Sequence, residues 1–107
     1  MQGQTEIKKE GETLVAILPP EIDHHGLIGV REQIDRALFE ARPHLLVLDF
    51  SDVRFMDSSG IGLILGRCEV CEHLSATVRL CGASRTVMKL LKISGLEKIK
   101  NLSISDS

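Results

Sequence analysis

Two adjacent serines stand near the centre of this sequence, beside residues that could direct their chemistry. The segment 55–67 reads FMDSSGIGLILGR, with Ser58 and Ser59 directly after Asp57. A serine hydroxyl can accept a phosphoryl group, or it can attack a substrate when a base activates it. At the start of a helix, a serine most often caps free amide groups instead. The residue types leave all three roles open, and they do not choose between Ser58 and Ser59.

The predicted helix after the serines contains three glycines, although a glycine weakens a helix interior by roughly 1 kcal/mol relative to alanine. Helical spacing predicts a core face made of Ile61, Ile64, Leu65, Cys68 and Cys71. It predicts an outer face made of Gly62, Leu63, Gly66, Val70 and His73. Gly62 and Gly66 are four residues apart and would form a flat strip without side chains. Such a strip suits the docking of another protein, and it equally suits close packing against a loop of the same domain.

A phosphate on one of these serines would change the surface more than the fold. It adds a charge of about −1.5 to −2 near neutral pH, which the N-terminus of a helix tolerates. Asp57 is adjacent, and Glu21 and Asp23 lie at another junction between a strand and a helix. If the two junctions are close in space, the phosphate would lie among carboxylates. A partner that fits the neutral hydroxyl would then be repelled.

The elements that position the serines follow from the hydrophobic pattern. The predicted strands are 4–9, 13–18, 44–50 and 76–82. The first two would form a hairpin, and the run 44–50 is typical of a strand that is covered on both faces. Strands that alternate with helices must run parallel and connect through crossovers. The pattern therefore predicts a mixed four-stranded sheet with one antiparallel hairpin.

Three to four helices complete the predicted fold. They run from Asp23 or His24 to Ala41, from the serines onward, from Ser84 to Gly95, and briefly within 96–102. Asp23 would be the N-cap of the first helix. The tail from about residue 101 to residue 107 is predicted to be loose. The fold class is α/β, with residues 1–107 forming a single sandwich-like domain.

The composition limits the functional classes. The chain has 107 residues, 43% of them hydrophobic, a net charge of −2 and a pI of about 6.1. This charge argues against direct binding of nucleic acid through a general basic surface. The longest apolar stretches are too short for a membrane span, and the polar N-terminus does not resemble a signal peptide. We expect a cytoplasmic protein that does not bind membranes.

Two residue pairs could suggest a metal or redox site. Cys68 and Cys71 fall on the predicted core face, and Cys81 lies on a separate strand. No further ligand follows the pair His24-His25 at a suitable spacing. We therefore expect no metal and no cofactor.

A serine-dependent hydrolase is the alternative from a different class, because Ser58 is predicted to follow a strand and to begin a helix. However, the segment MDSSG lacks the G-x-S-x-G pattern of such nucleophiles. Nothing in the sequence brings His44 or His73 toward Ser58. We expect a binding protein that is not an enzyme.

Three segments resemble one protein family. FMDSSGIGLILGR closely resembles the phosphorylation-site segment of anti-sigma factor antagonists, which belong to the STAS (sulphate transporter and anti-sigma factor antagonist) domains. EIDHHGL at 21–27 is similar to the family's Glu-Leu-Asp junction, and KLLKISGLEKI at 89–99 is similar to its third helix. Pro20 and Gly26 depart from the family pattern, which often has Gly and a hydroxyl residue there. This departure concerns the shape of the loop and leaves the serine motif intact.

The resemblance implies a switch between binding partners. The unphosphorylated domain would bind an anti-sigma factor and thereby release a sigma factor. The anti-sigma factor would also be a serine kinase that phosphorylates Ser58 and so ends the binding, and a serine phosphatase would reset the cycle. The segments MDSSG and DHH most resemble the sporulation branch, which acts on sigma F. An antagonist for general stress or another STAS regulator is the alternative within the family.

The expected partner-binding residues combine the resemblance with the helical pattern. They are Asp23, Asp57, Ser59, Gly62, Leu63 and Gly66. Asp23 matches a family position that contacts the partner, whereas Gly62, Leu63 and Gly66 come from the predicted outer face.

Overall fold

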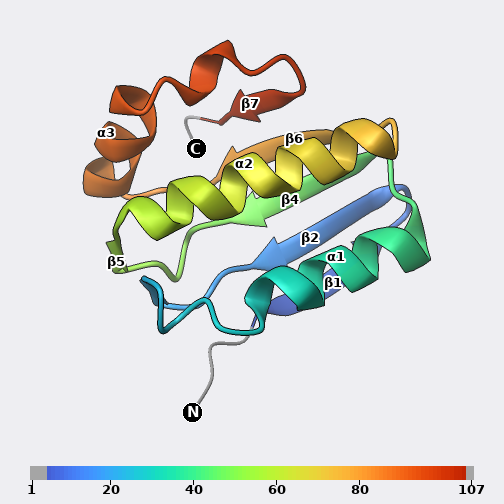
Figure 1. The fold of residues 1–107 in the computed structure, drawn as a ribbon, viewed down its shortest axis with the longest axis horizontal. Coiled ribbons are helices and arrows are strands. Elements are labelled where there is room, and N and C mark those ends of the chain that lie inside the picture. The colour runs from blue at the N-terminus through green and yellow to red at the C-terminus, as the bar shows by residue number, and fades with distance from the viewer. Residues whose placement is uncertain (1–4, 106–107) are drawn as a thin grey trace.

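A five-stranded sheet forms the centre of the protein (Figure 1). The computed structural model describes residues 5–105. The strand order is β1 (Glu6–Glu10), β2 (Thr13–Ile17), β4 (Leu45–Asp49), β6 (Thr77–Cys81) and β7 (Leu102–Ile104). β1 pairs with β2 in antiparallel fashion, and the other neighbouring pairs are parallel. The predicted hairpin and the mixed sheet are confirmed, but the sheet has five strands and not the predicted four, because Leu102–Ile104 add β7. Residue 4 of the first predicted strand lies outside the described residues.

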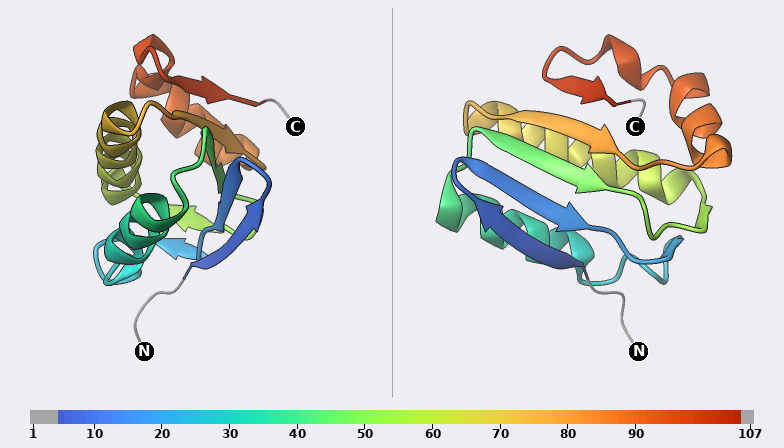
Figure 2. Two further views of the ribbon diagram at one scale, coloured as in Figure 1. Left: turned by 90° about the vertical axis from the view of Figure 1, so that its right-hand side faces the viewer. Right: turned by 180° about the vertical axis from the view of Figure 1, so that it is seen from behind.

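Helices α1 (Val30–Ala41) and α2 (Ser58–His73) lie side by side on one face of the sheet (Figure 2). Helix α3 (Arg85–Ile93) and the short 3-10 helix η1 (Leu96–Lys98) follow β6. The buried core is aliphatic, and it includes Leu14, Ala16, Leu46, Leu48, Val78 and Leu80 from the strands and Ile34, Leu38, Ile64 and Leu91 from the helices. Within residues 5–105, no helix has the length and apolarity needed to cross a bilayer.

The prediction that strand 44–50 is covered on both faces is wrong. Leu46 and Leu48 are buried under the helices, whereas Leu45 and Val47 on the alternate positions remain partly exposed. Seen from behind, the sheet has no helix over this second face in the described part of the chain (Figure 2). The apolar run 44–50 therefore belongs to a central strand that the helices cover on one face only, and its other face is partly exposed.

The first helix begins later than predicted, because residues 23–29 form turns. Gly29, with φ +86°, precedes the first helical residue, Val30. Asp23 is not the N-cap of α1. Its Oδ1 accepts a hydrogen bond from the Gly26 amide at 2.6 Å, and its carbonyl accepts one from the Leu27 amide at 3.0 Å. Asp23 therefore stabilises the loop before α1.

The C-terminal segment is more ordered than predicted. Leu102–Ile104 form β7, which pairs with β6 through Val78 and Leu80. The Asn101 side chain donates to the Cys68 carbonyl at 3.0 Å and so ties this segment to α2. The prediction of a loose tail is therefore wrong for 102–104, and residues 106–107 lie outside the described residues. The short helix predicted within 96–102 is confirmed only as η1.

Candidate functional site

The N-terminus of α2 presents the two serines in different environments. Asp57 is the N-cap, and its Oδ1 accepts a hydrogen bond from the Ser59 amide at 2.8 Å. Its carbonyl accepts one from the Gly60 amide at 3.0 Å. Ser58 is exposed, whereas Ser59 is half-buried. Within residues 5–105 the Ser58 hydroxyl makes no hydrogen bond. Because Asp57 already caps the helix, the Ser58 hydroxyl is available for another role.

A second, two-stranded sheet joins the strand-to-helix junction at Glu21 and Asp23 to the junction before Ser58. β3 (Glu21–Ile22) pairs in parallel with β5 (Phe55–Met56), and the Asp57 amide donates to the Ile22 carbonyl at 3.0 Å. The segment that carries Asp23 therefore runs beside the segment that leads to Ser58. The two junctions are therefore close in space, as the proposed effect of a phosphate near Asp57 and Asp23 requires.

Gly26 explains how the loop at Asp23 can be so tight. A Cβ at this position would collide with the carbonyl oxygen of Glu21 and would lie 3.1 Å from the Asp23 carboxylate. The loop therefore requires glycine at position 26.

The three glycines of α2 lie in two different structural environments. A Cβ on Gly60 would lie 2.5 Å from Met56 Sδ and 2.9 Å from Ile22 Cγ2, so this glycine lets α2 pack closely on β3 and β5. A Cβ on Gly62 or Gly66 would meet no atom within 4 Å. Packing against the domain's own loops therefore does not explain the latter two. They leave a smooth strip on the accessible side of the helix.

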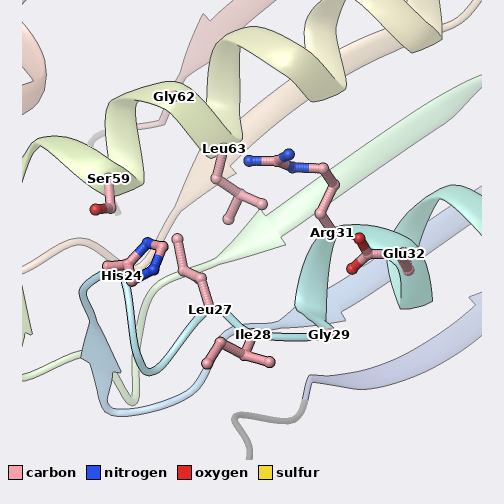
Figure 3. A pocket seen from close by; sticks show the side chains of 9 residues that line it. All are labelled: His24, Leu27, Ile28, Gly29, Arg31, Glu32, Ser59, Gly62 and Leu63. Atoms are coloured by element: carbon pink, nitrogen blue, oxygen red, sulfur yellow. The ribbon is translucent and has the colours of Figure 1, made fainter.

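The predicted faces of α2 need two corrections. Leu63, predicted on the outer face, is only 2% exposed, whereas Leu65, predicted in the core, is 45% exposed. Leu63 is buried and points toward Leu27 in the loop before α1 (Figure 3). Leu65 lies seven residues after Ser58, so that the exposed side of α2 carries Ser58, Gly62 and Leu65 together. Leu63 is thus not part of an exposed docking strip.

Arg67 was missed by the sequence analysis. It is 4% exposed, and its Nε lies 3.0 Å from Asp35 Oδ1 on α1. Burial lowers the pKa of Arg67, and burial also raises the pKa of Asp35 against the opposing effect of Arg67. The pair links α1 to α2. A charged residue on an otherwise apolar helix face was the available signal.

A pocket of about 410 Å³ lies between the loop before α1 and the first two turns of α2 (Figure 3). Leu27 and Leu63 point toward each other at its base, Arg31 extends from α1 toward α2, and His24 lies near Ser59. Its remaining lining residues are Ile28, Gly29, Glu32 and Gly62. The structure thus brings Ser59, Gly62 and Leu63 to one concave site. Ser58 and Gly66 do not line it.

The cysteines have the properties of core residues. Burial raises the pKa of Cys68 to about 11 and that of Cys71 to about 12, so both remain protonated thiols at neutral pH. Cys81 is half-buried, and its pKa is raised by burial and by nearby Asp49. Among residues 5–105, no group of three or more His, Cys, Asp or Glu side chains is arranged to hold a metal ion.

His44 and His73, the two histidines considered for a hydrolase, lie away from Ser58, whereas His24 lies near the adjacent Ser59 (Figure 3). His44 lies just before β4, where its amide donates to the Glu12 carbonyl, whereas Ser58 follows the carboxyl end of that strand. His73 ends α2, about 22 Å from Ser58 at the usual rise per residue. Within the described residues, no histidine forms a hydrogen bond with Ser58.

Comparison with known proteins identifies the family. The model of the STAS domain family matches residues 4–106. The chain belongs to the STAS domain family. The anti-sigma F factor antagonist of Paenibacillus polymyxa is 36% identical over 99 residues, which make up 92% of this chain and 85% of that protein.

Solved STAS structures have the same fold. The unphosphorylated anti-sigma factor antagonist SpoIIAA matches with a TM-score of 0.73 at 29% identity, over 96% of this chain and 88% of that one. The Bacillus cell fate determinant SpoIIAA in its phosphorylated form matches with a TM-score of 0.71 at 31% identity, over 96% and 92%. Both forms of SpoIIAA therefore share the fold of this STAS domain.

Proposed function

We propose that this protein is an anti-sigma factor antagonist whose unphosphorylated form binds an anti-sigma factor. Phosphorylation of Ser58 ends that binding. The observation that carries the proposal is the exposed Ser58 hydroxyl on a helix whose N-terminus is already capped by Asp57. The likeness to SpoIIAA, which is known in both phosphorylation states, supports it.

The docking surface combines the start of α2 with the loop before α1. Ser58, Gly62 and Gly66 supply a smooth strip on which the backbone of a partner can lie closely. Asp23, Asp57 and Ser59 border its N-terminal end. Leu63 contributes from below, as an apolar residue at the base of the pocket. The partner therefore contacts a strip, an adjoining pocket and two carboxylates.

The phosphate acts on the surface and leaves the fold in place. The amides of Ser59 and Gly60 already donate to Asp57, so the helix N-terminus has few free donors to draw a Ser58 phosphate inward. The phosphate would project beside the carboxylates of Asp57 and Asp23. A partner that buries this region would meet an unpaired charge, at a cost of about 2–5 kcal/mol in binding free energy.

The partners follow from this cycle. The anti-sigma factor is also the serine kinase, and a separate serine phosphatase restores the neutral hydroxyl. The curated relative from Paenibacillus polymyxa is an anti-sigma F factor antagonist, which favours sigma F and sporulation for this protein. In this cycle the protein acts by binding its partner.

Intact-mass measurement tests the proposal directly. The protein is mixed with the anti-sigma factor kinase of the same organism and ATP, and the mass gain of one phosphate is followed. Ser58→Ala should abolish the gain, whereas Ser59→Ala should keep it. Binding of the kinase to the phosphorylated protein should fall by about 30-fold or more, the lower end of the estimated loss. A phosphate on Ser59 alone, or equal binding of both forms, would refute the proposal.

A further inference from the structure

Helix α3 carries a stripe of positive charge that the rest of the protein does not share. Residues 85–100 contain five basic residues and one acidic residue, whereas the remainder of the chain contains eight basic and fourteen acidic residues. Arg85, Lys89 and Lys92 are four and three residues apart, so they lie along one side of α3. All three are exposed, and Lys98 and Lys100 extend the positive charge beyond the helix.

This stripe is not needed to hold the fold together. Within residues 5–105, the side chains of Arg85, Lys89 and Lys92 make no hydrogen bond and no ion pair. The buried side of α3 is formed by Val87 and Leu91. Ile93 follows Lys89 by one helical turn and is 76% exposed, more than any other large hydrophobic residue in the described part of the chain. A cationic stripe beside an exposed isoleucine is typical of a contact surface.

The position of α3 connects the stripe with the proposed docking site. Strands β4 and β6 end toward the side of the molecule where α2 begins, and α3 lies at this same end (Figures 1 and 2). A protein that approaches the start of α2 would therefore come within reach of the charge on α3. At physiological salt, exposed opposite charges attract each other appreciably within about 8 Å.

We propose that the stripe of Arg85, Lys89 and Lys92, together with Ile93, is a second contact surface for the anti-sigma factor. This inference rests on the proposed function. The surface fits an acidic region of that partner with an apolar residue among the carboxylates. The three cations steer the approach of the partner, and Ile93 holds the complex once it has formed. Because the rest of this chain is acidic, an acidic region of the partner is attracted only to α3, and this favours one orientation of the complex.

The test compares two triple variants with the same net charge. The test variant changes Arg85, Lys89 and Lys92 to Gln. The control variant changes Lys8, Lys9 and Arg42 to Gln, and these three residues are exposed and lie on β1 and at the end of α1. Association with the anti-sigma factor kinase is followed by stopped flow at low and high salt. The α3 variant should associate about tenfold more slowly at low salt, with the difference vanishing at high salt. The control should associate like the wild type.

The contribution of Ile93 is tested separately through dissociation. Ile93→Ser should dissociate several-fold faster with an unchanged association rate, whereas Phe39→Ser, an exposed aromatic residue on α1, should not. Wild-type protein that fails to bind the kinase would refute the proposed function. Wild-type binding with equal rates for both triple variants would refute only the role of α3. The role of α3 would also be refuted if the α3 variant lost binding to duplex DNA or to phosphatidylglycerol vesicles while its association with the kinase stayed unchanged.

Discussion

Arg67 Nε lies 3.0 Å from Asp35 Oδ1, across the contact between α2 and α1. The Arg67 side chain is 5% exposed, whereas the Asp35 side chain is 26% exposed. The two partners therefore differ in their access to water. When Arg67 is removed, Asp35 can still be hydrated in part, but when Asp35 is removed, the buried guanidinium loses its nearest counter-charge.

This difference predicts unequal effects of the two substitutions. Asp35→Ala should lower the free energy of unfolding by about 3 kcal/mol, because it leaves an uncompensated buried charge. Arg67→Met should cost about 1–2 kcal/mol, because its side chain fills a similar space without a charge. Urea unfolding of both variants and of the double variant measures the coupling. An Arg67→Met variant that is less stable than Asp35→Ala would contradict this account of the pair.

The faces of α2 show why the site was only partly predictable. Apolar residues occur nearly all round this helix, so the wheel could not separate the side toward α1 from the exposed side, and Leu63 and Leu65 were exchanged. The buried position of Arg67 depends on Asp35, which lies 32 residues earlier in the chain. No local pattern indicates such a partner. The serine motif was recognised because Asp57, Ser58 and Ser59 act through sequence neighbours.

Substitution of Gly60 and of Gly62 by alanine should change the stability of the fold in opposite directions. Gly60→Ala should destabilise the fold by about 1–3 kcal/mol, because the new Cβ would lie 2.5 Å from Met56 Sδ. Gly62→Ala should stabilise it by about 0.5–1 kcal/mol, because the added methyl meets open space and alanine favours the helix. Chemical unfolding of the two variants under the same conditions measures both changes. Equal effects would contradict the packing assigned to Gly60.

The fold was predictable where elements are long and periodic. The hairpin and the strands 44–50 and 76–82 follow from short hydrophobic runs bounded by turn residues. The third helix follows from helical spacing and from the Ser84 cap, which accepts a hydrogen bond from the Val87 amide. Strand β7 has only three residues and depends on β6 for its pairing. The start of α1 was misplaced because Asp23 has the residue type of an N-cap but serves a turn. Such short or competing signals are resolved by tertiary contacts.

The buried thiols of Cys68 and Cys71 predict a loss of stability at alkaline pH. Their pKa values of about 11 and about 12 in the folded protein exceed the usual value for an unfolded chain of about 8.5. The unfolded state therefore releases these protons first, and stability falls as the pH rises from about 8.5 toward the folded values. By pH 10 the loss should be about 2 kcal/mol per thiol, because each pH unit above the unfolded pKa costs about 1.4 kcal/mol.

The double variant Cys68→Ala, Cys71→Ala isolates this effect. It should be less stable at neutral pH because it leaves small cavities, but its stability should fall less steeply between pH 8.5 and about 10. Urea unfolding at several pH values measures the slope for both proteins. The same slope in wild type and variant would show that the thiols do not cause the alkaline loss.

The open strip at Gly62 and Gly66 predicts that partner binding can be blocked without loss of the fold. Gly66→Glu adds a charged side chain where a Cβ would meet no atom within 4 Å, so its thermal stability should stay near that of the wild type or increase. Its affinity for the anti-sigma factor should fall at least tenfold, because the partner can no longer approach the backbone of α2. Gly66→Ala is the matched control, since it restores the helix preference with only one added methyl group. It should lose much less affinity than Gly66→Glu when both are measured by calorimetry. Full affinity of a folded Gly66→Glu variant would remove this part of α2 from the docking surface and would place the contact entirely at Ser58 and the loop around Asp23.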